Sequence, residues 1–107
     1  MSIAQTPPAP YYAVIFTSTR TDADKGYETM VAAMIKLAAQ QPGFLGMESA
    51  RDSIGITVSY WENLEAIATW QRDSAHQVAQ QRGRELWYDS FKTRICRVER
   101  DYGFQRE

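Results

Sequence analysis

The run from Tyr11 to Ser18 carries aromatic or branched side chains at most positions, which is typical of a β-strand. Because successive side chains of a strand point to opposite faces of its sheet, Val14 and Phe16 share one face while Ala13 and Ile15 share the other. Both faces are therefore apolar, and such a strand is normally buried on both sides. Both faces of the sheet that contains this strand must therefore be buried.

The remaining pattern predicts two helical regions and three further strands. Apolar residues recur at helical spacing from Tyr27 to Gln41, after a polar stretch, Thr21–Asp24, that offers N-cap residues. Pro42-Gly43 ends this helix. Strands are then expected at 44–51 and 56–60, on either side of a hairpin turn at 52–55, and the last strand is expected at 88–99.

The second helical region is predicted to consist of two pieces. Asn63 is the expected N-cap of the first piece, which breaks at 72–74. Asp73 is the natural N-cap of a second piece that starts at Ser74. This piece ends near Arg82 if Gly83 is its C-cap, or it continues to Trp87.

The order β-α-β-β-α-β is that of the split βαβ, ferredoxin-like arrangement of the α+β class. Both helices of this arrangement cover one face of a four-stranded sheet, and the other face is left bare. The simplest cover for a second apolar face is the same face of another copy, related by a two-fold axis. The sequence therefore predicts a homodimer.

The last strand changes its apolar phase. Phe91 and Ile95 share one face, whereas Cys96 and Val98 share the other, so the pattern shifts by one residue between Ile95 and Cys96. This shift predicts a β-bulge there or a change of neighbouring strand, for example by crossing to the partner's sheet. Cys96 is the only cysteine, which excludes an internal disulfide and a cysteine-based zinc site.

Length and composition indicate one globular domain, expected at 11–102, between a mobile, proline-containing leader (1–10) and a short C-terminal tail (103–107). The net charge of −1 comes from interspersed acidic and basic residues, so neither nucleic acid nor an anionic membrane is an expected partner. The leader has no basic or apolar run of a signal peptide, which favours a cytoplasmic location.

The chemistry-bearing side chains are concentrated between Ser59 and Phe91, which holds all three tryptophans and the only histidine, His76. His76 can be a general base or a haem ligand, or simply a surface or capping histidine. No second histidine or carboxylate pair shares its helix face, so no metal site is predicted.

Trp70 can form the wall of a pocket for a planar ligand, or belong to the core. No glycine-rich phosphate loop is present, so no nucleotide cofactor is expected.

Three blocks of residues carry a resemblance to a known family: Tyr60 to Ile67 with Trp70, then Ser74-Ala75-His76, then Gly83-Arg84-Glu85 followed by Trp87-Tyr88. With the Pro42-Gly43-Phe44 turn, the chain resembles the antibiotic biosynthesis monooxygenase domain family from about Tyr11 to Tyr102. The resemblance implies a dimeric α+β barrel, in which two ferredoxin-like sheets lie face to face. It also implies that Trp70 is a pocket tryptophan, and that Ala66 occupies the place of a polar asparagine one helical turn earlier.

Two functional hypotheses follow from the resemblance. The first is a monooxygenase without metal or flavin that acts on a small aromatic or polyketide-like phenol. Its pocket lies between sheet and helices, with His76 and Trp70 as catalytic residues and with a substrate-binding wall of Tyr60, Phe16, Met34, Leu86 and Arg84, where Arg84 holds an anionic oxygen. The second is a dimer that binds a small molecule without turnover. The haem-degrading members fit less well, because their histidine is replaced by Gln80 and the first strand lacks their asparagine.

Overall fold

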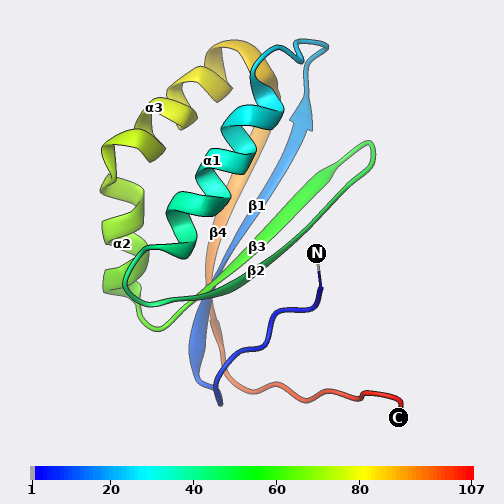
Figure 1. Cartoon of the computed structure of the whole chain (residues 1–107), viewed down its shortest axis with the longest axis vertical. Coiled ribbons are helices and arrows are strands. Elements are labelled where there is room, and N and C mark those ends of the chain that lie inside the picture. Colours follow the sequence, from blue (N-terminus) through cyan, green and yellow to red (C-terminus); the bar gives the residue numbers. More distant parts are fainter. Residues whose placement is uncertain (1) are drawn as a thin grey trace.

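The computed structural model describes residues 2–107, which form a four-stranded antiparallel sheet with helices on one face (Figure 1). The strands are β1 (Tyr11–Arg20), β2 (Phe44–Arg51), β3 (Gly55–Trp61) and β4 (Tyr88–Val98), arranged in the order β2-β3-β1-β4. This is the ferredoxin-like α+β architecture that the element order predicts. Both helical regions connect strands that are not adjacent in the sheet.

The register of the strands decides which side chains face the helices. Val14 of β1 lies opposite Ser59 of β3 and Ile95 of β4, and Ser59 in turn lies opposite Met47 of β2. These positions share one face, because directly paired residues point to the same side of a sheet. The opposite face carries the alternate positions, including the pair Ile15 and Val58.

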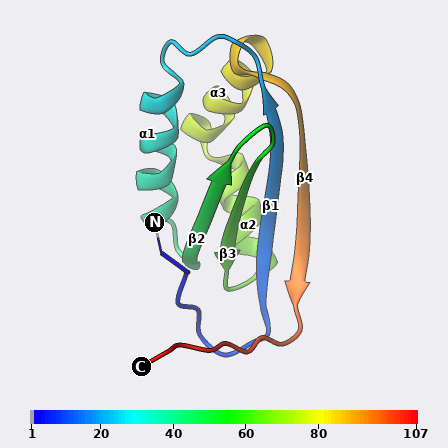
Figure 2. The ribbon, with the colours of Figure 1, turned by 90° about the vertical axis from the view of Figure 1, so that its right-hand side faces the viewer.

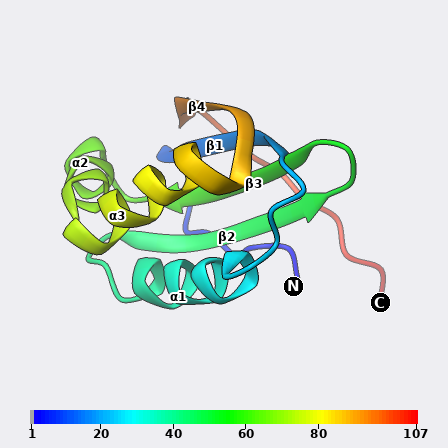
Figure 3. The same cartoon turned by 90° about the horizontal axis from the view of Figure 1, so that it is seen from above.

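Helices α1 (Tyr27–Ala39), α2 (Leu64–Arg72) and α3 (Ser74–Arg82) lie on one side of the sheet, and both chain termini lie on the other (Figure 3). The core beneath the helices is small. It combines Ala38 of α1, Trp61 of β3, and Ile67 and Trp70 of α2. Trp61 is fully buried, and it packs α2 against the sheet through Ile67 and Trp70.

Two predicted helix starts are confirmed and one is wrong. The Asn63 side chain accepts a hydrogen bond from the Ala66 N–H (2.8 Å), and the Asp73 side chain accepts one from the His76 N–H (3.1 Å). The first helix is not capped by a side chain from Thr21–Asp24. Its N-cap is Gly26, whose left-handed backbone (φ 83°) suits a residue without a Cβ.

The α-helix of the second piece ends at Arg82, with Gly83 in the C-cap position, and the helical region as a whole continues to Trp87. Residues Gly83–Trp87 continue from α3 as a π-helical turn that leads directly into β4. A π-helical turn pairs residues five apart instead of four, so it shifts the positions that follow around the helix axis.

The bulge predicted between Ile95 and Cys96 is wrong. β4 pairs with β1 in unbroken register from Val98 back to Ser90, and the irregularity lies at the other end, between Thr19 and Arg20. The phase shift in the sequence has another cause. Ile95 faces the helix side on an edge strand, where it is 48% exposed and needs no apolar cover.

The N-terminal segment lies against the sheet face opposite to the helices, and the C-terminal segment extends away from the end of β4 (Figure 1 and Figure 2). The Ala4 N–H donates to the Glu48 carboxylate (3.0 Å), and the Tyr60 hydroxyl donates to the same carboxylate (2.7 Å). The Tyr11 hydroxyl accepts from Thr6 and donates to Asp101. These contacts place the predicted leader against the sheet. Its mobility stays a prediction, and its first residue, Met1, lies outside the described residues.

Within residues 2–107, no helix has the length and apolar character needed to cross a membrane.

Candidate functional site

A cavity of about 210 Å³ lies between the helix-side face of the sheet and the helices. Most of its wall is apolar, with contributions that include Val14, Phe16, Met30, Val31, Met34 and Ile35. The α1 side chains among them are half-buried. Polar groups enter at a few positions, which is the composition expected of a small-molecule site.

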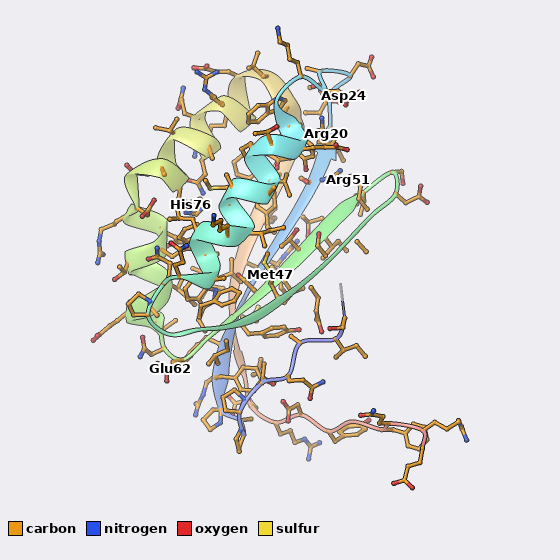
Figure 4. The ribbon with its side chains drawn as sticks, in the orientation of Figure 1. Arg20, Asp24, Met47, Arg51, Glu62 and His76 are labelled. Atoms are coloured by element: carbon orange, nitrogen blue, oxygen red, sulfur yellow. The ribbon has the colours of Figure 1, made fainter. Side chains whose placement is uncertain are left out.

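The corner between α2 and α3 brings His76 to this cavity (Figure 4). The Asp73 N–H donates to the Trp70 carbonyl (3.1 Å) and ends α2, while the Asp73 side chain begins α3. His76 is therefore in the first turn of α3, and its Nδ1 lies 2.9 Å from the same Trp70 carbonyl. A carbonyl oxygen has two lone pairs, so it can accept both bonds.

The contact with Trp70 determines the tautomer of His76. A carbonyl can only accept, so Nδ1 must carry the proton of the neutral ring, and the lone pair is then on Nε2. The His76 ring also stacks on the Trp70 indole, with ring centres 4.2 Å apart and planes 12° apart. Trp70 in turn stacks on buried Trp61 at 6.2 Å. The imidazole thus has a fixed plane, a fixed tautomer and a basic nitrogen.

The pKa of His76 is lowered from its ordinary value of 6.5, mainly because burial disfavours the charged imidazolium. The hydrogen bond to the Trp70 carbonyl and the charge of Asp73 act in the opposite direction. At neutral pH the ring is therefore neutral, which is the form that a general base needs.

We expect this shift to make the stability of the fold depend on pH. Since the folded pKa lies below the unfolded value of 6.5, the unfolded chain binds the proton more readily. The contribution of neutral His76 is complete above pH 6.5 and is lost as the pH falls through the folded pKa. Thermal unfolding between pH 4.5 and 8 should show this loss in the wild type, and His76→Gln should flatten it. Identical slopes would contradict the burial of the imidazole.

The other end of the cavity, where α1 begins, carries Tyr27, Tyr88 and Arg51. Tyr88 is half-buried, and burial together with a hydrogen bond to Tyr27 raises its pKa strongly, so its phenol stays protonated and can donate. Neither Tyr88 nor Arg51 is among the predicted site residues. Arg51 has the same parity as Met47 and Ser49 of β2, so strand alternation could have identified it.

Four of the seven predicted site residues line the cavity, and three do not. Phe16, Met34, Trp70 and His76 are in its wall. Tyr60 is on the opposite face of the sheet, bonded to Glu48, because its neighbour Trp61 takes the core face. The prediction that Tyr60 belongs to the pocket is wrong.

Leu86 and Arg84 are also outside the cavity, so their predicted places in its wall are wrong. Leu86 is 44% exposed. The guanidinium carbon of Arg84 lies 5.7 Å from the centre of the Phe91 ring, and Arg84 does not line the cavity. The apolar face that contains Ala79 can include Leu86 at i+7 or Trp87 at i+8, and the structure buries Trp87.

No group of three histidine, cysteine, aspartate or glutamate side chains in the described part of the chain is arranged to hold a metal ion.

The fold and the cavity together define a class: a ferredoxin-like domain with a small apolar pocket between its sheet and helices. Residues 10–82 match the model of the family described as antibiotic biosynthesis monooxygenase. The chain therefore belongs to this family.

Individual relatives agree with this assignment. The chain is 48% identical to the uncharacterized protein YqjZ of Bacillus subtilis (strain 168) over 105 residues, which cover 96% of this chain and 92% of YqjZ. Its fold is also similar to that of a variant of SnoaB, a cofactor-independent oxygenase from Streptomyces nogalater, with a TM-score of 0.75 at 15% identity over 87% of this chain and 97% of SnoaB. Rv0793 of Mycobacterium tuberculosis gives a TM-score of 0.74 at 14% identity, over 90% of this chain and 100% of that one.

Proposed function

We propose that this protein is a cofactor-independent monooxygenase of a small, electron-rich phenol, with His76 as its general base. One observation carries the proposal: neutral His76 is held by the Trp70 carbonyl and the Trp70 ring, with its basic Nε2 free of that carbonyl, in the wall of an apolar cavity. The similarity of the fold to SnoaB, described as a cofactor-independent oxygenase, supports the same reaction class.

In the proposed reaction, Nε2 of His76 removes the phenolic proton. The phenolate is electron-rich enough to give one electron to O₂, and the two radicals then combine to form a carbon–oxygen bond. The peroxide anion formed in this way takes back the proton from His76. The O–O bond of the resulting hydroperoxide breaks as the carbon loses its remaining hydrogen. One oxygen atom stays on the substrate as a quinone carbonyl, and the other leaves as water, so no external reductant is consumed. Trp70 contributes a flat, apolar surface for the substrate ring.

The cavity limits the size of the substrate. A buried apolar cavity of about 150 Å³ is known to hold one benzene ring. The 210 Å³ found here therefore has room for one ring and part of a second. A bicyclic phenol that projects toward the mouth of the cavity is the expected size class.

The test is oxygen consumption by the purified protein with 1-naphthol, dihydroxynaphthalenes and hydroxylated anthrones, followed by an oxygen electrode and by product absorbance. We expect substrate-dependent uptake of one O₂ per quinone formed, without added metal or flavin. Tight binding of these phenols without oxygen uptake would contradict the proposal.

The second candidate function is binding of such a phenol without turnover. A specific observation favours it. Ala66, which stands where the resemblance implies an asparagine, packs on the core and lies beside Gly43, so no amide is supplied there. No observation on the described residues favours haem. Gln80, at the place of the haem-branch histidine, supplies an amide to the cavity wall.

We also propose that the protein is a cytoplasmic homodimer whose copies meet through the sheet face opposite to the helices. The pair Ile15 and Val58 lies on that face, and Ile56 beside them is 42% exposed in the single chain. Light scattering after size exclusion should give twice the mass of one chain, and Val58→Asp should shift it toward one. A wild-type mass of one chain at tens of micromolar would contradict the dimer.

A further inference from the structure

We propose that Arg51 forms an anion site at the end of the cavity remote from His76, and that the substrate is a phenol with a carboxylate at its far end. The inference rests on the proposed function for the reacting end only. The anion site itself follows from the position and contacts of Arg51.

Arg51 is the last residue of β2, and its side chain folds back over β3. It pairs with Gly55, and a Cβ added to Gly55 would lie 2.1 Å from Nη2 of Arg51. Only a residue without a side chain leaves room for this path. The path brings Arg51, which is exposed to solvent, to the wall of the cavity, beside Arg20 and away from His76 (Figure 4).

Ser18 fixes the guanidinium in this position. Nη1 of Arg51 donates to the Ser18 carbonyl (3.4 Å), and Nη2 donates to the Ser18 hydroxyl. Ser18 is 2% exposed, so the anchor is rigid. A guanidinium has five N–H donors, and these two bonds leave the others for a ligand.

The charge of Arg51 is not balanced by an ion pair. The ion pairs within residues 2–107 join Arg20 to Asp24 and Arg97 to Glu99. An anchored guanidinium with unused donors is suited to a planar, two-oxygen anion, because both groups are forked. A carboxylate on the ligand fits this description.

Arg20 lies at the same end of the cavity, but its side chain bonds to other residues of the chain. Its Nε donates to the Trp87 carbonyl (3.0 Å), and Nη2 donates to the Ala23 carbonyl (2.9 Å). The guanidinium also lies 3.3 Å above the centre of the Tyr27 ring. Arg20 thus has a partner on each side, whereas Arg51 keeps donors for a ligand.

The cavity wall near Arg51 suits a flat ring. Phe16, Tyr88 and Phe91 form a cluster with ring centres 5.3–5.9 Å apart, and all three line the cavity. Along β2, the lining residues run from Met47 to Arg51, a span of about 13 Å at about 3.3 Å per residue. A rigid bicyclic phenol with its carboxylate opposite to its hydroxyl would extend from the His76 end of the cavity toward Arg51.

The test compares three ligands that differ only at the far end: 6-hydroxy-2-naphthoate, its methyl ester and 2-naphthol. Calorimetry under nitrogen measures binding without turnover. We expect the wild type to bind the acid at least about tenfold more tightly than the other two, the effect of about one charge-assisted hydrogen bond. Arg51→Gln should abolish this preference, with less than a twofold change for 2-naphthol, and Arg51→Lys should retain part of it.

The matched control is Arg94→Gln, which removes the same charge. Arg94 pairs with Ile15, so it is on the opposite face of the sheet, and its loss should leave the preference intact. Equal wild-type affinity for acid and ester would overturn the anion site, as would an equal loss of preference in the control. Oxygen uptake is measured separately, so a preference for the acid without uptake would reject the proposed reaction and keep the anion site.

Discussion

Replacing His76 by glutamine should lower kcat/KM for oxygen uptake by about 10²- to 10⁴-fold, the usual contribution of a positioned general base. Glutamine can still donate to the Trp70 carbonyl, so the α2–α3 corner keeps its hydrogen bond. It cannot accept a proton at neutral pH. The affinity for 2-naphthol, measured by calorimetry under nitrogen, should change little because most of the cavity wall is apolar.

A second variant separates chemistry from structure. His76→Ala leaves a space beside Trp70, and added imidazole should restore part of the lost rate if the missing group is a base. Arg84→Gln, outside the cavity wall, is the control and should retain full activity. Oxygen uptake by His76→Gln at the wild-type rate would show that His76 is not the general base.

Replacing Trp61 by alanine should lower the free energy of unfolding by about 3–5 kcal/mol, the usual cost of truncating a large aromatic side chain in a core. Trp61 is 0% exposed, and its indole packs edge-on against Phe44 with ring centres 5.4 Å apart. Its Nε1 donates to the Ser59 hydroxyl (2.9 Å), so the truncation also removes a buried hydrogen bond. Urea unfolding followed by circular dichroism measures the loss.

The comparison variant for Trp61 is Leu64→Ala. Leu64 is 53% exposed on α2, and its truncation should change the unfolding free energy by no more than about 0.5 kcal/mol. A loss below about 1 kcal/mol for Trp61→Ala would show that the core closes around the space. The Trp61→Ala variant should also disturb the site, because Trp61 stacks on Trp70 and Trp70 stacks on His76.

The order and type of the elements could be predicted from the sequence because turn residues and periodicity agree at nearly every boundary. The sheet face that meets the helices could not. Alternation shows only that Tyr60 and Trp61 point in opposite directions, and both faces of β1 are apolar, so either could have been the core face. The assignment of Tyr60 to the pocket failed for this reason.

Three further residues were misassigned or missed because periodicity alone leaves their positions open. The helix face that contains Ala79 can include either Leu86 or Trp87, and because Trp87 is the buried one, Leu86 falls outside the cavity, as does Arg84. Arg51 is remote in sequence from the tryptophan-rich segment, and it reaches the cavity only because Gly55 lets its side chain cross β3. His76 and Trp70 were found because they are close both in sequence and in space.

The single residue between α2 and α3, Asp73, has a consequence for how this protein should be compared with its relatives. Each residue of an α-helix adds about 100° of rotation, so one insertion or deletion at this corner would turn the imidazole to another side. Spacing between Trp70 and His76 is therefore a stricter criterion for shared chemistry than overall identity. Chains that keep both residues but change the interval would be expected to have lost the base while retaining the fold.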